Sequence, residues 1–169
     1  MNGWPGGERR PASPADELDC EVRPAEHGDV PGLVAGASEL LLELGGTPAP
    51  GELLEQVAHE LIDDPDAGSL IVAEHGGEIV GLLGASWQTA LRIPGSYGLI
   101  QELWVAKRLR YRELGTELLN ELIAQARARG IGRLEVGLPS ERYPHLAATE
   151  SFYETHGFQG VGLRMRRQL

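Results

Sequence analysis

One continuous stretch, Glu102 to Gly130, constrains the fold of this chain more than any other. An apolar, extended pattern ends at Val105, and four cationic residues follow within the next seven positions. From Leu114 onward, apolar side chains recur at the spacing of one helix face, and Gly130 stands where a helix C-terminal glycine is expected. The stretch therefore predicts a strand, a basic loop and a helix. Backbone N–H groups at such a helix N-terminus form a natural anion site. The four cations are Lys107, Arg108, Arg110 and Arg112.

The composition is that of an ordinary soluble domain, with 169 residues, a hydrophobic fraction of 41% and a charged fraction of 24%. The net charge of -10 disfavours binding to nucleic acid and to anionic membranes. Against that background, a loop with four of the 15 Lys and Arg residues concentrates positive charge at one place. No apolar run is long enough to span a bilayer. The single cysteine, Cys20, cannot form an intramolecular disulfide, so we expect a reducing, cytoplasmic location.

The chain divides into a tail and one domain. Residues 1–19 are rich in Gly, Pro and charge, so we expect a flexible tail, followed by a domain over residues 20–169. The patterns in the domain predict the order β–α–α–β–β–β–α–β–α–β, with a hairpin turn at His75 to Glu78 and a last strand from Phe158 to Met165. Helices end at glycines, at Gly45–Gly46, Gly130 and Gly157. This order implies a mixed sheet with helices on its faces.

Two segments in this order, LWVAKRLRYRELGTELL and SFYETHGF (Ser151 to Phe158), carry a family resemblance. Together they resemble the GNAT superfamily of acetyl-CoA-dependent N-acetyltransferases, and the resemblance covers about residues 20 to 169. It implies a single-domain α/β fold of the α+β type. The expected sheet is mixed and mostly antiparallel, with six to seven strands, splayed central strands and about four helices over both faces.

The resemblance also implies a site for acetyl-CoA as co-substrate, with no metal. Backbone groups at the strand end contact the pantetheine arm in the manner of an added strand. Arg110 begins the pyrophosphate loop, Gly115 is its last glycine position, and the N–H groups of residues 113 to 116 point toward the diphosphate, with a hydroxyl donor on Thr116. The expected cofactor-binding residues are Leu103, Trp104, Val105, Arg110, Tyr111, Arg112, Glu113, Leu114, Gly115 and Thr116.

Three positions depart from the family pattern. Tyr111 and Glu113 stand where glycine is usual, and Leu146 stands where an asparagine usually precedes the family tyrosine by seven residues. A glycine lets the backbone approach phosphate closely, and the charge of Glu113 opposes a bound diphosphate. Either the Glu113 side chain turns outward toward Arg110 or Arg112 and binding survives, or the anion site is weakened.

Two residues are expected to carry the chemistry. Tyr153 matches the family tyrosine near the cofactor sulfur, where a phenol can protonate the departing thiolate. An ammonium acceptor must lose a proton before it attacks a thioester, and Glu102, beside the strand end, is the first candidate for that base. Glu135 is the second candidate, and ordered water is an alternative to both. A strand irregularity there would prevent a choice between Gln101 and Glu102 by alternation.

The acceptor cleft is expected between residues 39–56 and 89–96. Acidic side chains there suit a small-molecule amine or a basic peptide: Glu39, Glu43, Glu52, Glu55 and Glu60. The predicted function is therefore acetyl transfer from acetyl-CoA to a primary amine by direct attack in a ternary complex, in a protein that forms a possible homodimer. The alternatives are a GNAT-fold acyl-CoA-binding or regulatory module with weak or no transferase activity, and a structural dimer whose helix merely resembles the motif.

Overall fold

The computed structural model describes residues 19–110, 113–162, 165 and 167, and the expected tail lies outside them except for Asp19. These residues form five strands: β1 (Glu21–Pro24), β2 (Gly68–His75), β3 (Glu78–Ala90), β4 (Ile93–Val105) and β5 (Leu134–Val136). The α-helices are α1 (Val30–Glu43), α2 (Gly51–Asp63), α3 (Leu114–Ala128) and α4 (Leu146–Thr155). Short 3₁₀ turns, η2 (His27–Asp29) and η3 (Lys107–Leu109), precede α1 and α3.

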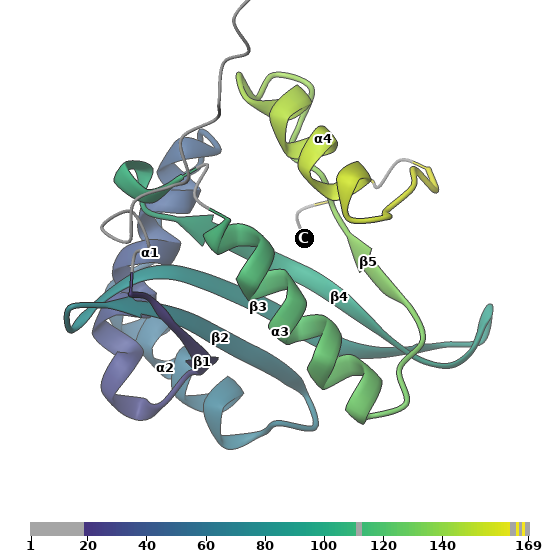
Figure 1. Ribbon diagram of the computed structural model, residues 1–169, viewed down its shortest axis with the longest axis horizontal. Coiled ribbons are helices and arrows are strands. Elements are labelled where there is room, and N and C mark those ends of the chain that lie inside the picture. Colours follow the sequence, from purple (N-terminus) through teal and green to yellow (C-terminus); the bar gives the residue numbers. More distant parts are fainter. Residues whose placement is uncertain (1–18, 111–112, 163–164, 166, 168–169) are drawn as a thin grey trace, which may run out of the picture.

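The strands form one mixed sheet in the order β1-β2-β3-β4-β5. The first four are antiparallel, and β5 joins β4 in parallel over only three residue pairs, the last of them Ile100 with Val136. Beyond Ile100, β4 runs on to Val105 without pairing to β5, and Figure 1 shows β5 turning away toward α4 while β4 continues toward η3. This divergence is the expected splay of the central strands.

Helices cover both faces of the sheet (Figure 1). On one face α1 lies over β3 and β4 and α2 lies over β2, while α3 crosses β1 to β4 on the other. The apolar stripe expected of α3 is buried as predicted, at Leu114, Leu118, Leu119, Leu122 and Ala126. Burial of each large aliphatic side chain contributes roughly 1.5–3 kcal/mol, so this stripe fixes the helix on the sheet.

Helix ends follow the glycine signals in the sequence. At the end of α3, Gly130 has a φ of 72°, and the N–H of Ile131 bonds the carbonyl of Ala126 at 2.9 Å. This closing turn needs a left-handed residue, which glycine supplies without a steric cost. The same arrangement ends α1 at Gly45 and α4 at Gly157, so all three predicted helix ends are confirmed.

Two features of the sheet differ from the sequence prediction. The described residues contain five strands instead of six to seven, because the described part of the expected last strand, Phe158 to Gly162 and Met165, is not extended into the sheet. Leu163 and Arg164 of that segment lie outside the described residues. The β3–β4 hairpin is longer than the sequence pattern predicts, which is a strand from Ile79 to Trp87 and a next strand from Tyr97 to Val105, since β3 continues to Ala90 and β4 begins at Ile93. No helix in the described part of the chain is both long and apolar enough to cross a membrane.

Candidate active site

The backbone of β4 is irregular where it leaves β5. Gly84 of β3 pairs with Glu102, but the next residue, Ala85, pairs with Ile100, so Gln101 is the extra residue of a β-bulge. Past the bulge, the N–H of Ala106 bonds the carbonyl of Val80 at 2.8 Å. Because main-chain groups alternate along a strand, those of Leu103 and Val105 point to the opposite edge, toward the splay. This is the edge at which the family resemblance implies contacts to a pantetheine arm.

The bulge also fixes the direction of Glu102. Trp104 packs against Gly36 of α1, so Glu102, two residues earlier, lies on the same face of the sheet, above Gly84. A Cβ on residue 84 would collide with the Glu102 carboxylate, so the glycine provides the space that this side chain occupies. Glu102 has no ion-pair partner among the described residues, and burial raises its pKa to about 7. Gln101, by contrast, is exposed and donates to Ser86 Oγ at 3.0 Å.

The turn before α3 contains a left-handed residue. Glu113 is the N-terminal cap of α3 and has a φ of 66°, the only positive value at a non-glycine residue in the described part of the chain. This left-handed conformation explains why the family pattern has glycine there. The Glu113 side chain is exposed, whereas Leu114 is buried. Tyr111 and Arg112 lie outside the described residues.

The first turn of α3 contacts α4. The ring of Phe152 would lie 3.5 Å from a Cβ on Gly115, so the helices approach closely at this glycine. Thr116 Oγ1 lies 3.1 Å from His156 Nε2, whose other ring nitrogen, Nδ1, lies 2.7 Å from the carbonyl oxygen of Phe152. A neutral imidazole that donates from Nδ1 accepts at Nε2. In that tautomer the Thr116 hydroxyl donates to His156.

Arg110 is held by two contacts. Its Nε donates to the carbonyl of Val105 at 2.8 Å, and its Nη2 donates to both carboxylate oxygens of Glu43, at 2.7 and 2.8 Å. Of the other loop cations, Lys107 lies 3.7 Å from Glu43, and Arg108 pairs with Glu78 at 2.6 Å. The three loop cations that the structure describes are therefore paired with acids, and the fourth, Arg112, lies outside the described residues.

Tyr153 lies on α4 and is 6% exposed. Its ring makes edge contacts with Phe152 and Phe158, at centroid distances of 5.1 and 5.2 Å, and burial raises the pKa of its phenol. Because α4 docks on α3, Tyr153 comes from the face opposite to Glu102. Glu135, the second base candidate, is on β5, and its carboxylate lies 3.6 Å from Arg92 Nη2.

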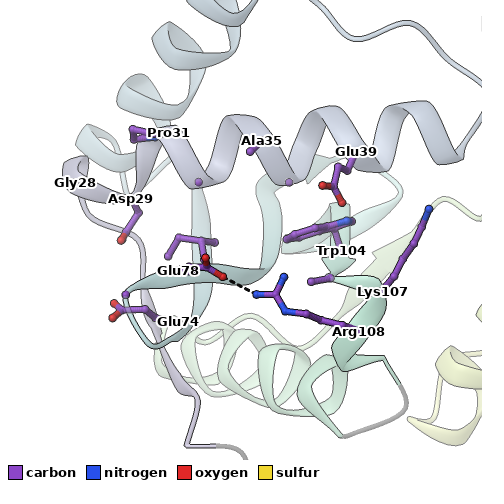
Figure 2. A pocket seen from close by; sticks show the side chains of 15 residues that line it. Gly28, Asp29, Pro31, Ala35, Glu39, Glu74, Glu78, Trp104, Lys107 and Arg108 are labelled. Atoms are coloured by element: carbon purple, nitrogen blue, oxygen red, sulfur yellow. Dashed lines mark hydrogen bonds and ion pairs between the residues drawn. The ribbon is translucent and has the colours of Figure 1, made fainter.

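An open pocket of about 780 Å³ lies elsewhere, between α1, the β2–β3 hairpin and η3 (Figure 2). Trp104 and Ile79 line it, Glu39 and Lys107 stand at one end, and the Arg108–Glu78 ion pair crosses its mouth. It includes neither Glu102 nor Tyr153. We place the candidate site at the splay of β4 from β5, because Glu102 and the unpaired main-chain edge of β4 lie there.

The acidic residues expected to line an acceptor cleft differ in how far they are available to a ligand. The Glu43 carboxylate is ion-paired with Arg110 and Lys107. The other four acids are exposed: Glu39, Glu52, Glu55 and Glu60. Within the described ranges, no three His, Cys, Asp or Glu residues are grouped so that they would hold a metal ion.

Comparison with known proteins decides the family. The model of the acetyltransferase (GNAT) family matches residues 38–158. The chain belongs to the GNAT acetyltransferase family. A comparison with curated proteins found no match. Membership sets aside the possibility that α3 merely resembles the GNAT motif, and it agrees with the mixed sheet and the splay described above.

Several solved structures share this GNAT fold. A Trypanosoma brucei acetyltransferase is 26% identical, with a TM-score of 0.68, covering 89% of this chain and 100% of its own. An integron cassette protein from the Cole Harbour Salt Marsh metagenome is also 26% identical, with a TM-score of 0.72 and coverages of 88% and 89%. A protein described as a predicted acetyltransferase from Clostridium acetobutylicum, solved with acetyl-CoA, is 18% identical, with a TM-score of 0.70 and coverages of 88% and 96%.

The sequence did not predict three contacts at this GNAT site. Gly84 leaves the space that Glu102 occupies, His156 hydrogen-bonds Thr116, and Glu43 pairs with Arg110. Each joins residues that are far apart in the chain, so local periodicity carries no signal for them. Only the contact between Glu43 and Arg110 left a signal in the sequence. Glu43 is a carboxylate at the end of a predicted helix, just before Gly45–Gly46, and the chain also has a basic loop that could supply its partner.

Proposed function

We propose that this chain transfers an acetyl group from acetyl-CoA to a primary amine by direct attack in a ternary complex. The observation that carries the proposal is Glu102. It is a half-buried carboxyl without an ion-pair partner among the described residues, desolvation raises its pKa to about 7, and a bulge sets its direction where β4 leaves β5. A carboxylate with this pKa is matched to removing a proton from an ammonium group near neutral pH.

In the proposed reaction, Glu102 takes one proton from the ammonium acceptor. The free amine then attacks the thioester carbonyl and forms the new C–N bond. When the tetrahedral intermediate collapses, the C–S bond breaks and the phenol of Tyr153 protonates the departing thiolate. The second proton leaves the amide nitrogen and restores the phenol through solvent. The products are the N-acetylated amine, CoA thiol and the proton held by Glu102.

The diphosphate of acetyl-CoA would be held by the backbone N–H groups at the start of α3. The first-turn N–H groups of a helix have no partners within the helix, and the helix dipole favours an anion there. The left-handed turn at Glu113 supports this assignment, because it is the turn that a glycine-containing anion loop makes. The exposed acids of α2 support a cationic acceptor, either a small amine or a basic peptide.

The second candidate is a GNAT-fold module that binds acyl-CoA weakly and does not transfer the acyl group. The negative charge of Glu113 at the anion site favours it. Calorimetric titration with acetyl-CoA separates the two: the enzyme requires a dissociation constant in the micromolar range, and the module predicts no saturation at millimolar cofactor. A panel of primary amines, assayed by release of CoA thiol, then tests transfer directly. A chain that binds acetyl-CoA but acetylates no amine or basic peptide would contradict the proposal.

A further inference from the structure

Arg110 joins three elements that are far apart in the sequence. It follows η3, its Nε reaches back to the carbonyl of Val105 at the end of β4, and its Nη2 reaches Glu43 at the end of α1. The Glu43 carboxylate accepts from one nitrogen with both of its oxygens. A guanidinium held at two of its nitrogens cannot rotate, so these contacts fix the start of the loop that leads to α3.

The partner of Arg110 is itself well shielded from solvent. The side chain of Glu43 is 14% exposed and that of Arg110 is 26% exposed. Hydrogen bonds between charged groups are stronger than neutral ones, and partial burial protects them from screening by salt. The neighbouring pair of Arg108 and Glu78 is different: its side chains are 60% and 71% exposed (Figure 2). Exposed pairs of this kind contribute little.

The place where Arg110 acts is part of the proposed cofactor path. The carbonyl of Val105 points to the splayed edge of β4, and Glu113 begins α3 three residues after Arg110. Arg110 thus connects the edge proposed for the pantetheine arm with the turn proposed for the diphosphate. At its far end, Glu43 precedes Gly45–Gly46, where the chain leaves α1 for the proposed acceptor cleft.

We propose that Glu43 is a positioning residue for acetyl-CoA. It holds the Arg110 guanidinium against the Val105 carbonyl, and so it fixes Arg110 in place three residues before the Glu113 turn that is proposed to receive the diphosphate. In this role Arg110 acts through its contacts with Val105 and Glu43, and the backbone N–H groups at the start of α3 bind the diphosphate. The inference rests on the proposed function, since it concerns the same cofactor.

The test is Glu43→Gln, which keeps the size of the side chain but removes its charge. We expect the dissociation constant and the KM for acetyl-CoA to rise about 5–30-fold, with kcat within about 3-fold of the wild type. S-acetylpantetheine, which lacks the diphosphate, serves as a second acyl donor. Its kcat/KM should stay unchanged, because the loop has no diphosphate to receive. A general loss of stability would lower turnover with both donors alike.

The matched control is Glu78→Gln, which breaks an ion pair of the same loop with the same substitution. It should leave acetyl-CoA affinity unchanged. A double-mutant cycle with Arg110→Gln checks the pairing: once Arg110 is neutral, Glu43→Gln should add little to the loss of affinity. If Glu43→Gln does not fold, Glu43→Asp is the alternative, because it keeps the charge on a shorter side chain. It should raise the dissociation constant for acetyl-CoA by less than the roughly 5–30-fold expected of Glu43→Gln, and the kcat/KM for S-acetylpantetheine should again stay unchanged.

Three results would overturn the inference. Tighter acetyl-CoA binding in Glu43→Gln would mean that Glu43 competes with the diphosphate for Arg110. Unchanged affinity would mean that the pair only stabilises the fold, and equal losses with both donors would mean the same. These outcomes are distinct from failure of the proposed function, in which the wild-type chain itself neither binds acetyl-CoA nor uses either donor.

Discussion

Glu102 illustrates how one half-buried carboxyl can be useful for chemistry and costly for stability. Burial raises its pKa from the ordinary value of 4.5 to about 7, so the folded chain holds a proton that the unfolded chain releases between those pH values. The folded state binds more protons in this window, and its stability therefore falls as pH rises through it. The loss of unfolding free energy caused by ionising Glu102 is absent well below pH 4.5 and reaches its full size above pH 7.

Glu102→Gln should therefore stabilise the fold while it removes the base. We expect its gain in unfolding free energy over the wild type to be larger at pH 8 than at pH 5 by about 1–3 kcal/mol. In the wild type, kcat/KM should rise with pH through an apparent pKa near 7, and the variant should lose both the rate and this dependence. Chemical denaturation at the two pH values measures the first effect. A variant that is equally stabilised at both would show that the Glu102 carboxyl is not held neutral by burial.

Tyr153 is tested by removal of its hydroxyl alone. Tyr153→Phe keeps the ring that packs between Phe152 and Phe158, so the helix should stay seated. We expect turnover to fall roughly 10–1000-fold while acetyl-CoA affinity changes little, because the phenol acts only when the thiolate leaves. Steady-state kinetics together with direct cofactor titration separate the two quantities. Equal losses of affinity and turnover would instead indicate a packing role.

Glu113 has a backbone conformation that suits glycine and a charge that opposes an anion. Glu113→Gly should raise the unfolding free energy by about 1 kcal/mol through relief of the left-handed strain. It should also tighten acetyl-CoA binding roughly 2–5-fold through loss of the negative charge. Glu113→Gln removes the charge and keeps the strain, so it should tighten binding without stabilising. If neither variant binds acetyl-CoA better than the wild type, the diphosphate does not bind at this turn.

Among the elements, α1 depends on close contact with the sheet. A Cβ on Gly36 would lie 2.8 Å from both Leu82 Cδ2 and Trp104 Cε3. Gly36→Ala should therefore push α1 outward and lower the unfolding free energy by about 1–3 kcal/mol. It should also raise the KM for acetyl-CoA, because Glu43 at the end of α1 would reach Arg110 less well. Gly51→Ala, in open space at the start of α2, is the control and should leave both quantities near those of the wild type.

The elements that local signals specify were predictable from the sequence. The stripe of α3 and the glycine ends of α1, α3 and α4 depend on spacing and on backbone conformation within a few residues. The prediction of a strand after α4 was wrong for Phe158 to Gly162. A short apolar pattern does not show whether a neighbouring strand is available to pair. A strand irregularity near Gln101 and Glu102 was expected, but the position of the bulge was beyond reach for the same reason, since it is defined by the register of β4 on β3.

The direction of Glu102 and the partner of Arg110 show why the site was only partly predictable. The choice between Gln101 and Glu102 depends on the bulge, and the space for Glu102 depends on Gly84, eighteen positions earlier in the chain. Arg110 meets Glu43 only because α1 is laid across β4. Residue types and motif spacing indicated the chemistry, but tertiary contacts decide which charges remain free for a ligand.

At the scale of the whole molecule, the net charge of the protein repels its proposed cofactor. The net charge is -10, and acetyl-CoA is an anion. Three cations of the loop before α3 are paired with acids: Lys107 and Arg110 with Glu43, and Arg108 with Glu78. Among the described groups near the start of α3, the backbone N–H groups are left to attract the diphosphate at short range, while the net charge of the protein repels it at long range. Salt screens the long-range term over about 10 Å at 0.1 M and affects the short contacts less.

Acetyl-CoA binding should therefore tighten, roughly 2-fold or more, when salt is raised from about 20 to about 200 mM. A polycationic amine should show the opposite trend, with a KM that rises roughly 3-fold, because the acidic surface attracts it at low salt. S-acetylpantetheine carries no phosphate charge and is the control, with no expected change. Cofactor titrations and initial rates across the salt series measure all three. Acetyl-CoA affinity that falls steeply with salt would show instead that direct ion pairs with the loop cations dominate, and that the pairs with Glu43 and Glu78 open when the cofactor binds.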